Sequence, residues 1–277
     1  MTEGMRVVTL AEHRDILLGL LEDIRIHCEA EGLTYFLYAG TLIGALRHEG
    51  FIPWDDDLDV MMPRADYEVF CREFPRSGRV YLASGDTHGD FPYAYAKVCR
   101  SGTVVREPVA GGTDHFGVNV DVIPVDHVPA GRLAWRCHRA LAMAVRAVLL
   151  AKVVEPTPDL ARRTRVALRV ARALLRPVPT AALTRARTRV ATLRGGAATG
   201  HVGMLVASVP WRIAETDLAP AELVAFESVS APVPRKAADL LEQIYGDFMT
   251  LPPEHQRVPP HSSTAYWVQG DPREGAR

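Results

Sequence analysis

Four carboxylates lie within five consecutive positions of this chain, in the segment FIPWDDDLDV at residues 51–60. Asp57 and Asp59 alternate with apolar residues, so a strand at this position would place both carboxylates on one face. Two adjacent carboxylates raise each other's pKa unless a cation lies between them. The pattern therefore indicates a site for Mg²⁺ or Mn²⁺, which prefer oxygen ligands and keep coordination positions for substrate phosphates.

Two flanking features favour this interpretation over a solvated acidic turn after Pro53. Upstream, Gly40 and Thr41 lie between a predicted strand, TYFLY, and a predicted helix, LIGALRH, where backbone N–H groups can bind a phosphate. Downstream, Asp121 lies in the apolar run VNVDVIP, where an unpartnered carboxylate is costly. A neighbouring strand would bring Asp121 to the same metal centre as a third carboxylate.

Apolar periodicity predicts the elements that must position these residues. An opening amphipathic helix is indicated by Leu17, Leu20, Leu21, Ile24 and Cys28. Short extended runs between residues 79 and 125 predict a mixed or antiparallel sheet. Residues 131–195 predict three helices, interrupted at EPTPD and RPVPT, and strand character returns in GHVGMLVASVPW and LVAFESVSAPVP. A last helix, in KAADLLEQIYG, ends at Gly246. Together these patterns predict an α+β fold.

Composition narrows the functional class. The chain has 277 residues, 48% of them hydrophobic, and a formal net charge of -1, which argues against nucleic acid as a partner. The charge is uneven, because residues 132–194 carry fourteen arginines and Lys152 against Glu155 and Asp159. An Arg-rich helical face of this kind can bind an anionic acceptor, make peripheral contact with a membrane, or simply be solvated.

Cysteine usage and hydropathy predict the compartment. The four cysteines form no CxxC pair, which predicts reduced thiols that pack as small buried hydrophobic residues. The N-terminal residues contain no signal-peptide-like apolar segment, and the longest apolar run, residues 140–154, is broken by two charges. We therefore expect a cytoplasmic protein with no transmembrane segment.

Whole phrases of the chain resemble a known family. The successive signature blocks of the LicD family, which includes bacterial phosphocholine transferases and fukutin-related enzymes, are similar to YFLYAGTLIGALRHEGFIPWDDDLDVMMPRADYEVF, FGVNVDVIPVD and FESVSAPVPRKAADLLEQIYGDFMTLPPEHQR. The resemblance implies a nucleotidyltransferase-like mixed sheet flanked by helices, in a single catalytic domain over 1–277 with a helical insertion at 131–195. Two departures are Ala39, where the family often has a second glycine, and DVIP in place of the commoner DIFP.

The resemblance also implies an activity. LicD-type enzymes move a phosphorylated group, such as phosphocholine or a polyol phosphate, from a CDP-linked donor to a hydroxyl acceptor and release CMP. The acceptor would be a glycan or a secondary metabolite. Asp57, Asp59 and Asp121 are then the expected metal ligands and catalytic residues, with Asp121 as an alternative general base. Asp55 and Asp56 are expected to support the metal site or to be solvated.

The donor phosphates are expected to contact five residues, which are Gly40, Thr41, Arg47, His48 and Lys97. The alternative for Arg47 is a salt bridge to the acidic cluster, and the alternative for Lys97 is a structural ion pair. A true nucleotidyltransferase, which releases pyrophosphate from a nucleoside triphosphate, is the nearest alternative function. A non-catalytic nucleotide-binding protein of the same fold is the second, although all three carboxylates are present.

Overall fold

The computed structural model describes residues 5–89, 91–106, 116–154, 156, 161–193, 199–258 and 264–268. Its central sheet has the spatial order β2 (Phe36–Leu37), β3 (Asp59–Pro63), β7 (Asn119–His127), β5 (Ala96–Arg100) and β4 (Val80–Ala83). Strands β3 and β7 are parallel, and the other neighbours are antiparallel. Beyond them, β8 (His201–Met204) pairs with the end of β7 and with β9 (Trp211–Ala214). This mixed sheet and the α+β class confirm the sequence prediction.

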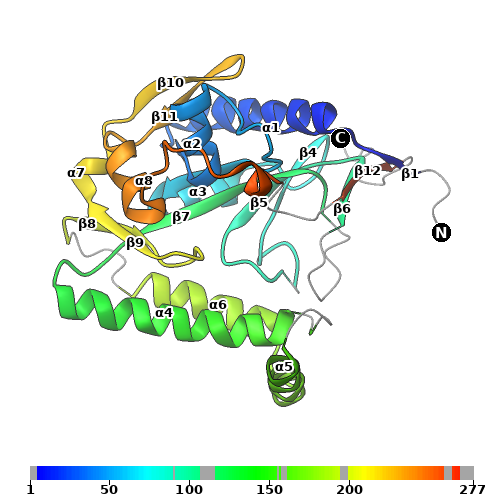
Figure 1. Ribbon diagram of the computed structural model, residues 1–277, viewed down its shortest axis with the longest axis vertical. Helices are drawn as coiled ribbons and strands as arrows, with labels where there is room; N and C mark the ends of the chain where they lie inside the picture. Colours follow the sequence, from blue (N-terminus) through cyan, green and yellow to red (C-terminus); the bar gives the residue numbers. More distant parts are fainter. Residues whose placement is uncertain are drawn as a thin grey trace.

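Three N-terminal helices support the sheet, and Figure 1 shows α1 and α3 on the side opposite α4. They are α1 (Leu10–Glu31), α2 (Ala39–His48) and α3 (Arg64–Glu73). The buried residues of α1 are the five predicted from helical spacing. Thr9 and Glu12 form a capping box at its start, and Gly32, with φ 67°, ends it in the left-handed conformation. Local signals therefore determine the extent of α1.

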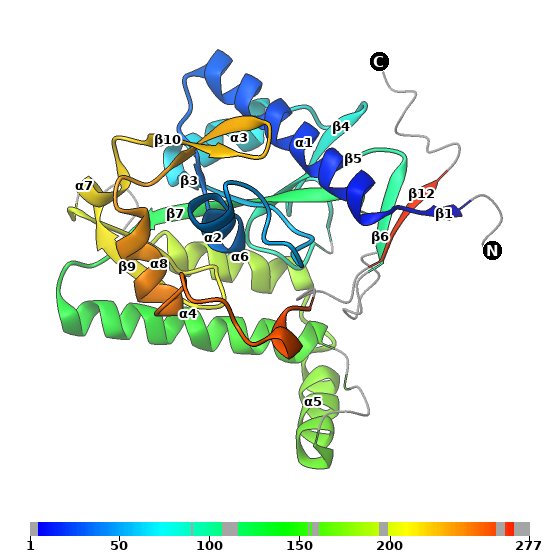
Figure 2. The same ribbon diagram turned by 45° about the horizontal axis from the view of Figure 1, so that its top comes forward.

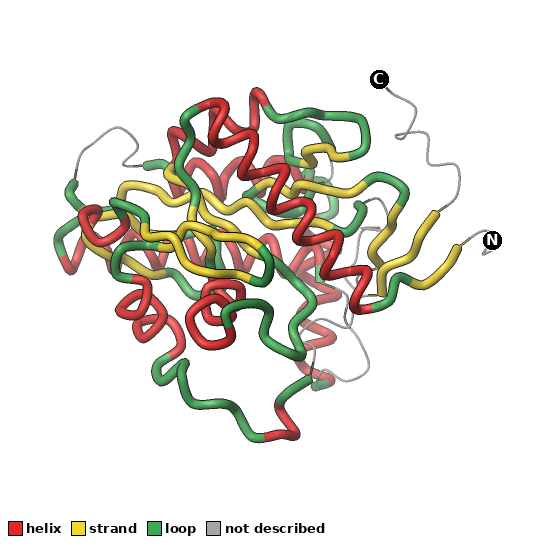
Figure 3. The backbone as a smooth tube through the Cα atoms, turned by 90° about the horizontal axis from the view of Figure 1, so that it is seen from above, coloured by secondary structure: helices red, strands yellow, loops and turns green. Residues whose placement is uncertain are grey.

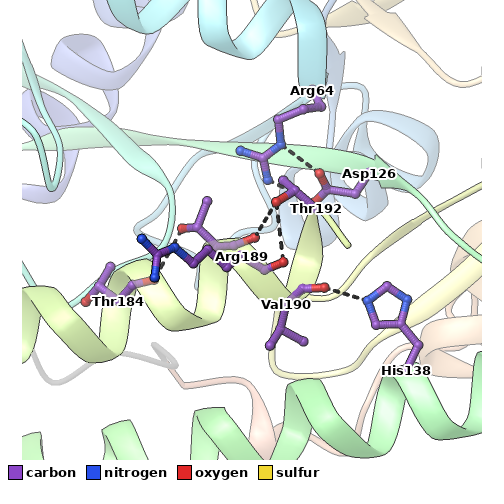
Figure 4. A network of polar contacts seen from close by, with 8 residues as sticks. Arg64, Asp126, His138, Thr184, Arg189, Val190 and Thr192 are labelled. Carbon is purple, nitrogen blue, oxygen red and sulfur yellow. Dashed lines mark hydrogen bonds and ion pairs between the residues drawn. The ribbon is translucent and has the colours of Figure 1, made fainter. Parts of the chain in front are cut away.

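The helical region comprises α4 (Arg132–Val153), α5 (Arg162–Leu175) and α6 (Thr180–Ala191), which confirms three predicted helices. Helices α4 and α6 lie along the other side of the sheet, whereas α5 projects away from the molecule (Figure 2). His138 of α4 bonds to the Val190 carbonyl of α6, close to a buried bidentate ion pair between Arg64 and Asp126 (Figure 4). The division into one domain with an insertion stays a prediction.

A second, smaller sheet joins the two ends of the chain. Its strands are β1 (Met5–Val7), β12 (Thr264–Val268) and β6 (Thr103–Arg106), and Figure 3 shows the first two side by side. The sequence analysis predicted neither β1 nor β12, because each is short and its partner lies at the far end of the chain.

The remaining elements lie near α2. A hairpin of β10 (Glu222–Phe226) and β11 (Val229–Val233) follows α7 (Glu215–Leu218) and precedes α8 (Ala237–Tyr245). Gly246, with φ 72°, ends α8 as predicted, and a short 3₁₀ turn follows at Glu254–Gln256. Among the described helices, none is long and apolar enough to cross a membrane.

The cysteines only partly follow the prediction. All four lie in the described part of the chain and none forms a disulfide there, as expected for reduced thiols. Cys28 and Cys99 are buried, but Cys71 is half-buried and Cys137 is exposed on α4. The expectation that each is a buried hydrophobic residue was therefore wrong for Cys137, because its position faces outward from the sheet-packing side of that helix.

Candidate active site

The centre of the site is a pair of carboxylates on adjacent parallel strands. Asp59 of β3 lies directly opposite Asp121 of β7, so the two side chains emerge on the same face about 4.8 Å apart along the sheet. The neighbouring Val60 and Val122 point the other way and are fully buried. This alternation fixes the register, because a one-residue slip would bury the carboxylates and expose the valines.

Asp57 reaches the same place from a loop rather than from a strand. Strand β3 begins at Asp59, so the prediction that both residues share one strand face was wrong. The Pro53 turn delays the strand by two residues. Asp57 nevertheless lines the same two cavities as Asp121. Asp57, Asp59 and Asp121, all half-buried, therefore line one cavity, with Asp57 contributed by the loop and the other two by strands.

The start of α2 is shaped around the acidic loop. Gly40 lies so close to this loop that a Cβ atom at Gly40 would be 2.7 Å from Asp55 Oδ2 and 4.0 Å from Asp57 Oδ1. A side chain at Gly40 would have to displace the Asp55 carboxylate. Asp55 itself is buried. Gly40 thus adjoins the carboxylates from the first turn of α2, and its contact with a donor phosphate stays a prediction.

Thr41 positions a carboxylate instead of facing the cavity. Its hydroxyl oxygen accepts a hydrogen bond from the backbone N–H of Asp59 at 2.9 Å, and the residue is only 3% exposed. The tyrosine before the helix adds a second constraint, because Tyr38 N–H donates to the Asp59 carbonyl at 3.0 Å. The Thr41 hydroxyl therefore supports the backbone of Asp59, and its contact with a donor phosphate stays a prediction.

Electrostatics show that the carboxylates oppose one another. Burial, followed by the charges of Asp57 and Asp121, raises the pKa of Asp59 well above its usual value. Burial and the nearby Asp57 raise the pKa of Asp55 to about 7. Burial also raises the pKa of Asp121, although Lys97 opposes that shift. A cation among these groups would stabilise their ionised forms.

Lys97 lies within this group of charges. Its ammonium donates to Asp121 Oδ1 at 2.6 Å and to Asn119 Oδ1 at 3.0 Å, and the residue is 5% exposed. The same ammonium lies 4.6 Å from the centroid of the Tyr93 ring and 5.8 Å from that of Tyr95. The structural ion pair anticipated for Lys97 is therefore present. Lys97 also lines the smaller cavity, so a contact with substrate stays a prediction.

Arg47 and His48 lie away from the carboxylates. They occupy the last turn of α2, roughly 10 Å along the helix from Gly40 at 1.5 Å per residue. Arg47 Nη1 donates to the Phe248 carbonyl at 2.6 Å, and its Nε bonds to the ring of His48. The alternative pair of Arg47 with the acidic cluster is not among the ion pairs of the described residues, and the phosphate contacts of Arg47 and His48 stay predictions.

Two residues of α1 hold the acidic loop, and the sequence analysis missed both. Arg14 Nη2 donates to the carbonyl oxygens of Ile52, Pro53 and Asp55 at 2.9, 2.9 and 3.0 Å. His13 lines the smaller cavity, and burial lowers its pKa although the Asp57 charge opposes that shift. Their positions follow from how α1 packs across the sheet, and no local pattern at residues 13 and 14 signals it.

Trp54 contributes to the loop from the other side. It packs partly buried against the hydrophobic core, and the Arg257 guanidinium lies 5.7 Å from its ring centroid. These contacts hold Trp54 in place two residues before the carboxylate loop reaches Asp56.

Two cavities adjoin the carboxylates. The smaller, of about 160 Å³, lies toward α1 and contains His13, Asp57, Lys97 and Asp121. The larger, of about 390 Å³, also contains Asp59 and extends to the helical region. Because Asp57 and Asp121 line both cavities, these two carboxylates lie where the cavities meet.

The donor set fits a hard divalent cation. Among the described residues, no group of three or more His, Cys, Asp or Glu side chains is already arranged as a metal cage. Mg²⁺ does not require such a cage, since it commonly uses one or two carboxylates and completes its coordination with water and phosphate oxygens. The raised pKa values of Asp55, Asp59 and Asp121 show that the carboxylates are poorly neutralised by the protein alone. Their oxygens suit Mg²⁺ or Mn²⁺.

Comparison with known proteins identifies the segment that carries this geometry. Residues 32–96 match the family model described as LicD/FKTN/FKRP, nucleotidyltransferase domain. A lipopolysaccharide cholinephosphotransferase LicD from Haemophilus influenzae is 48% identical over 66 residues, or 24% of this chain and 25% of the relative. Over this segment the chain is similar to the LicD family.

Other relatives of the LicD segment are uncharacterized proteins. One from Rickettsia typhi is 37% identical over 60 residues, which cover 22% of this chain and 19% of the relative. Another, from Rickettsia prowazekii, is 40% identical over 50 residues, which cover 18% of this chain and 19% of the relative. The chain thus matches a quarter or less of the length of these relatives. The shared segment contains Gly40, Asp57 and Asp59 but not Asp121.

Proposed function

We propose that this protein is a LicD-type phosphotransferase that moves a phosphorylated small group from a CDP-linked donor to an acceptor hydroxyl and releases CMP. The observation that carries the proposal is the pairing of Asp59 with Asp121 across β3 and β7, with Asp57 in the same cavity. The LicD-family match, and a relative named as a cholinephosphotransferase, support the reaction class. A phosphocholine-like or polyol-phosphate-like group fits this class, and the acceptor would be a glycan or a secondary metabolite.

In this proposal Asp57, Asp59 and Asp121 hold Mg²⁺ or Mn²⁺, which when bound supplies positive charge against the donor diphosphate and the departing CMP oxygen. The protein contributes the alignment of these ligands. Thr41 fixes the backbone of Asp59 through its hydroxyl, and Lys97 fixes one oxygen of Asp121. Because both supports are buried, the carboxylates keep their positions while substrates exchange.

The transfer forms a bond between the acceptor oxygen and the phosphorus and breaks the bond from that phosphorus to the CMP oxygen. The acceptor hydroxyl must also lose its proton to a base within hydrogen-bond reach. Asp121 is the candidate base if it does not serve as a metal ligand, since burial raises its pKa and so favours proton acceptance. The two roles for Asp121 stay alternatives.

The test is a panel of CDP-linked donors, including CDP-choline and CDP-ribitol, incubated with Mg²⁺ with and without hydroxyl acceptors. We expect acceptor-dependent release of CMP from at least one donor and no release in the presence of a chelator. Release of pyrophosphate from nucleoside triphosphates, without CMP release from any donor, would show that the protein is a nucleotidyltransferase instead. Nucleotide binding without either product would favour the non-catalytic alternative.

Location and partners stay predictions. We expect a cytoplasmic protein that does not bind nucleic acid, and peripheral contact with a membrane is compatible with the exposed, Arg-rich α5. Gly40 and Lys97 remain candidates for contact with the donor, because both adjoin the carboxylates.

A further inference from the structure

The larger cavity has a second wall, made by the helical region. Opposite the carboxylates of the sheet it is lined by Arg146 and Leu149 of α4 and by Arg187 of α6. The sequence analysis assigned no role to these arginines beyond a general Arg-rich face. The cavity volume of about 390 Å³ lies within the ~300–1,000 Å³ range of small-molecule sites.

Arg187 is buried without the partners that a buried charge normally has. The residue is 7% exposed, and its Nη2 donates to the Val206 carbonyl. Its Nε is also buried and has no hydrogen-bond partner among the described residues. A guanidinium presents five N–H donors, so most of its hydrogen-bonding capacity is unused. Leaving a buried charge in this state is costly unless a ligand completes the site.

The neighbouring charges do not neutralise Arg187. Burial lowers the pKa of Arg187 to about 10, and the like charge of Arg146 adds to that effect, with a smaller opposing contribution from Tyr95. The group therefore stays charged at neutral pH. Arg146 is half-buried, and its Nη2 donates to the Ser208 hydroxyl at 3.1 Å. Two guanidiniums thus face one cavity and repel each other.

A positively charged substrate group would fit this wall poorly. It would meet Arg146 and Arg187, and the nearby Tyr93 and Tyr95 rings already have the Lys97 ammonium against them. An oxyanion would instead accept hydrogen bonds from both guanidiniums and offset their repulsion. The ligand chemistry that fits the wall is therefore a phosphate group with two or more charged oxygens.

We propose that Arg187 and Arg146 form an oxyanion site for the diphosphate of the nucleotide donor, which would lie between this arginine pair and the carboxylates of Asp57, Asp59 and Asp121. The proposal rests on the proposed function for the identity of the donor, whereas the arginine pair itself rests on the cavity. It gives the helical region a direct role in substrate binding, with one arginine from α4 and one from α6.

The experiment is calorimetric titration of the full chain, with Mg²⁺ present, using three probes: CDP, inorganic pyrophosphate and cytidine. The variants are Arg187→Met, Arg187→Lys and Arg146→Met. Arg139→Met on α4 and Arg189→Met on α6 are matched controls, because both arginines are exposed and neither lines this cavity. Thermal unfolding of each variant is measured alongside.

We expect Arg187→Met to raise the Kd of CDP and of pyrophosphate by at least about tenfold, the size expected when a charge-assisted hydrogen bond is lost. Arg146→Met should raise both by about three- to tenfold, since Arg146 is less buried. The Kd values of Arg187→Lys should lie between those of Arg187→Met and wild type, because lysine keeps the charge but lacks the planar guanidinium. The Kd of cytidine should change less than twofold in every variant, and the two controls should match wild type.

The outcomes separate the two proposals. If Arg187→Met and Arg146→Met fold and bind CDP and pyrophosphate as wild type does, the oxyanion site is wrong. A lower melting temperature with an unchanged ratio of cytidine to CDP affinity would likewise show that Arg187 is merely structural. If wild type binds pyrophosphate through the arginines but does not bind CDP, the inference stands and the proposed donor is wrong. If Arg187→Met does not fold, the CDP and pyrophosphate affinities of Arg146→Met alone test the oxyanion site. Wild type that binds neither CDP nor pyrophosphate would overturn both proposals.

Discussion

The two walls of the larger cavity are built in different ways. On the sheet wall, Asp59 is held by two backbone hydrogen bonds and faces Asp121 in a fixed strand register. On the helical wall, α4 buries only His138, Ala142 and Leu149, and α6 only Thr184, Arg187 and Ala191. Many elements therefore hold the sheet wall in place. The helical wall has few buried residues, and one of them is the charged Arg187, which lines the cavity.

The charges on the two walls are complementary. Burial, followed by the neighbouring carboxylates, raises the pKa of Asp55 and Asp59 on the sheet wall, and burial, followed by the charge of Arg146, lowers the pKa of Arg187 on the helical wall. Each wall is therefore electrostatically unfavourable by itself. A cation on one side and a phosphate on the other would relieve both conflicts, and this difference suggests that the rigid wall carries the chemistry while the helical wall carries recognition.

Removing one carboxylate gives the largest expected effect. Asp59→Asn should lower turnover by about 10³-fold or more, because a metal ligand that stabilises transition-state charge is lost. Its melting temperature without divalent ions should rise. The folded-state pKa of Asp59 is raised, so the ionised carboxylate destabilises the fold at any pH above its unfolded pKa, and the amide removes that cost. Turnover and thermal unfolding at neutral pH measure the two effects.

Asp15→Asn provides the matched control, because Asp15 is an exposed carboxylate on α1, next to the residues that hold the acidic loop. It should change neither turnover nor stability. If Asp59→Asn kept wild-type turnover, the assignment of the sheet wall as the reacting centre would be wrong.

The next prediction compares the packing of the two regions. Leu21→Ala in α1 should lower the free energy of unfolding by about 2–5 kcal/mol, because Leu21 is 2% exposed in the core. Leu174→Ala in α5 should change it by less than about 0.5 kcal/mol, because Leu174 is 73% exposed. Urea denaturation of both variants checks the difference. Equal losses would show that α5 is buried against something in solution, and would contradict the contrast between the two regions.

Much of the sheet wall could be predicted from the sequence. Helix α1 follows from five apolar residues at helical spacing, and Asp59 and Asp121 both follow from carboxylates embedded in apolar strands. The sequence does not give the exact start of β3, so Asp57 was predicted in a strand and lies in a loop. Local alternation shows which residues share a face, but tertiary contacts decide where a strand begins.

The sequence predicted the helices of the helical wall, but not which of their residues line the cavity. The side of a helix that meets the cavity depends on how the helix packs, so no local signal separated Arg187 from its exposed neighbour Arg189. For the same reason, the sequence analysis missed the positions of His13 and Arg14 on α1. Arg47 illustrates the opposite case, since it is close in sequence to the acidic cluster but bonds to the Phe248 carbonyl from the last turn of α2.

A smaller effect is expected from the residue that positions Asp59. Thr41→Val keeps the shape of the side chain but removes the oxygen that accepts the Asp59 N–H, leaving a buried donor unpaired. Turnover should fall by about tenfold, and a higher Mg²⁺ concentration should be needed for half-maximal rate. Thr41→Ser should restore both, because it keeps the hydroxyl. Loss of stability without any change in the Mg²⁺ requirement would show that Thr41 is structural only.

The smallest predicted effect concerns backbone strain on the sheet wall. Ala39 begins α2 with φ 49°, in the left-handed region that favours glycine. In the described part of α4, α5 and α6, no non-glycine residue has a positive φ. The glycine that the LicD family often has at this position relieves that strain. Ala39→Gly should therefore raise the free energy of unfolding by about 0.5–1 kcal/mol, net of the added entropy of the unfolded chain. Ala45→Gly, in the interior of the same helix, should lower it by about 1 kcal/mol instead. Opposite signs for the two substitutions, measured by urea denaturation, would locate the strain at the edge of the cavity; equal destabilisation would mean that Ala39 is not strained.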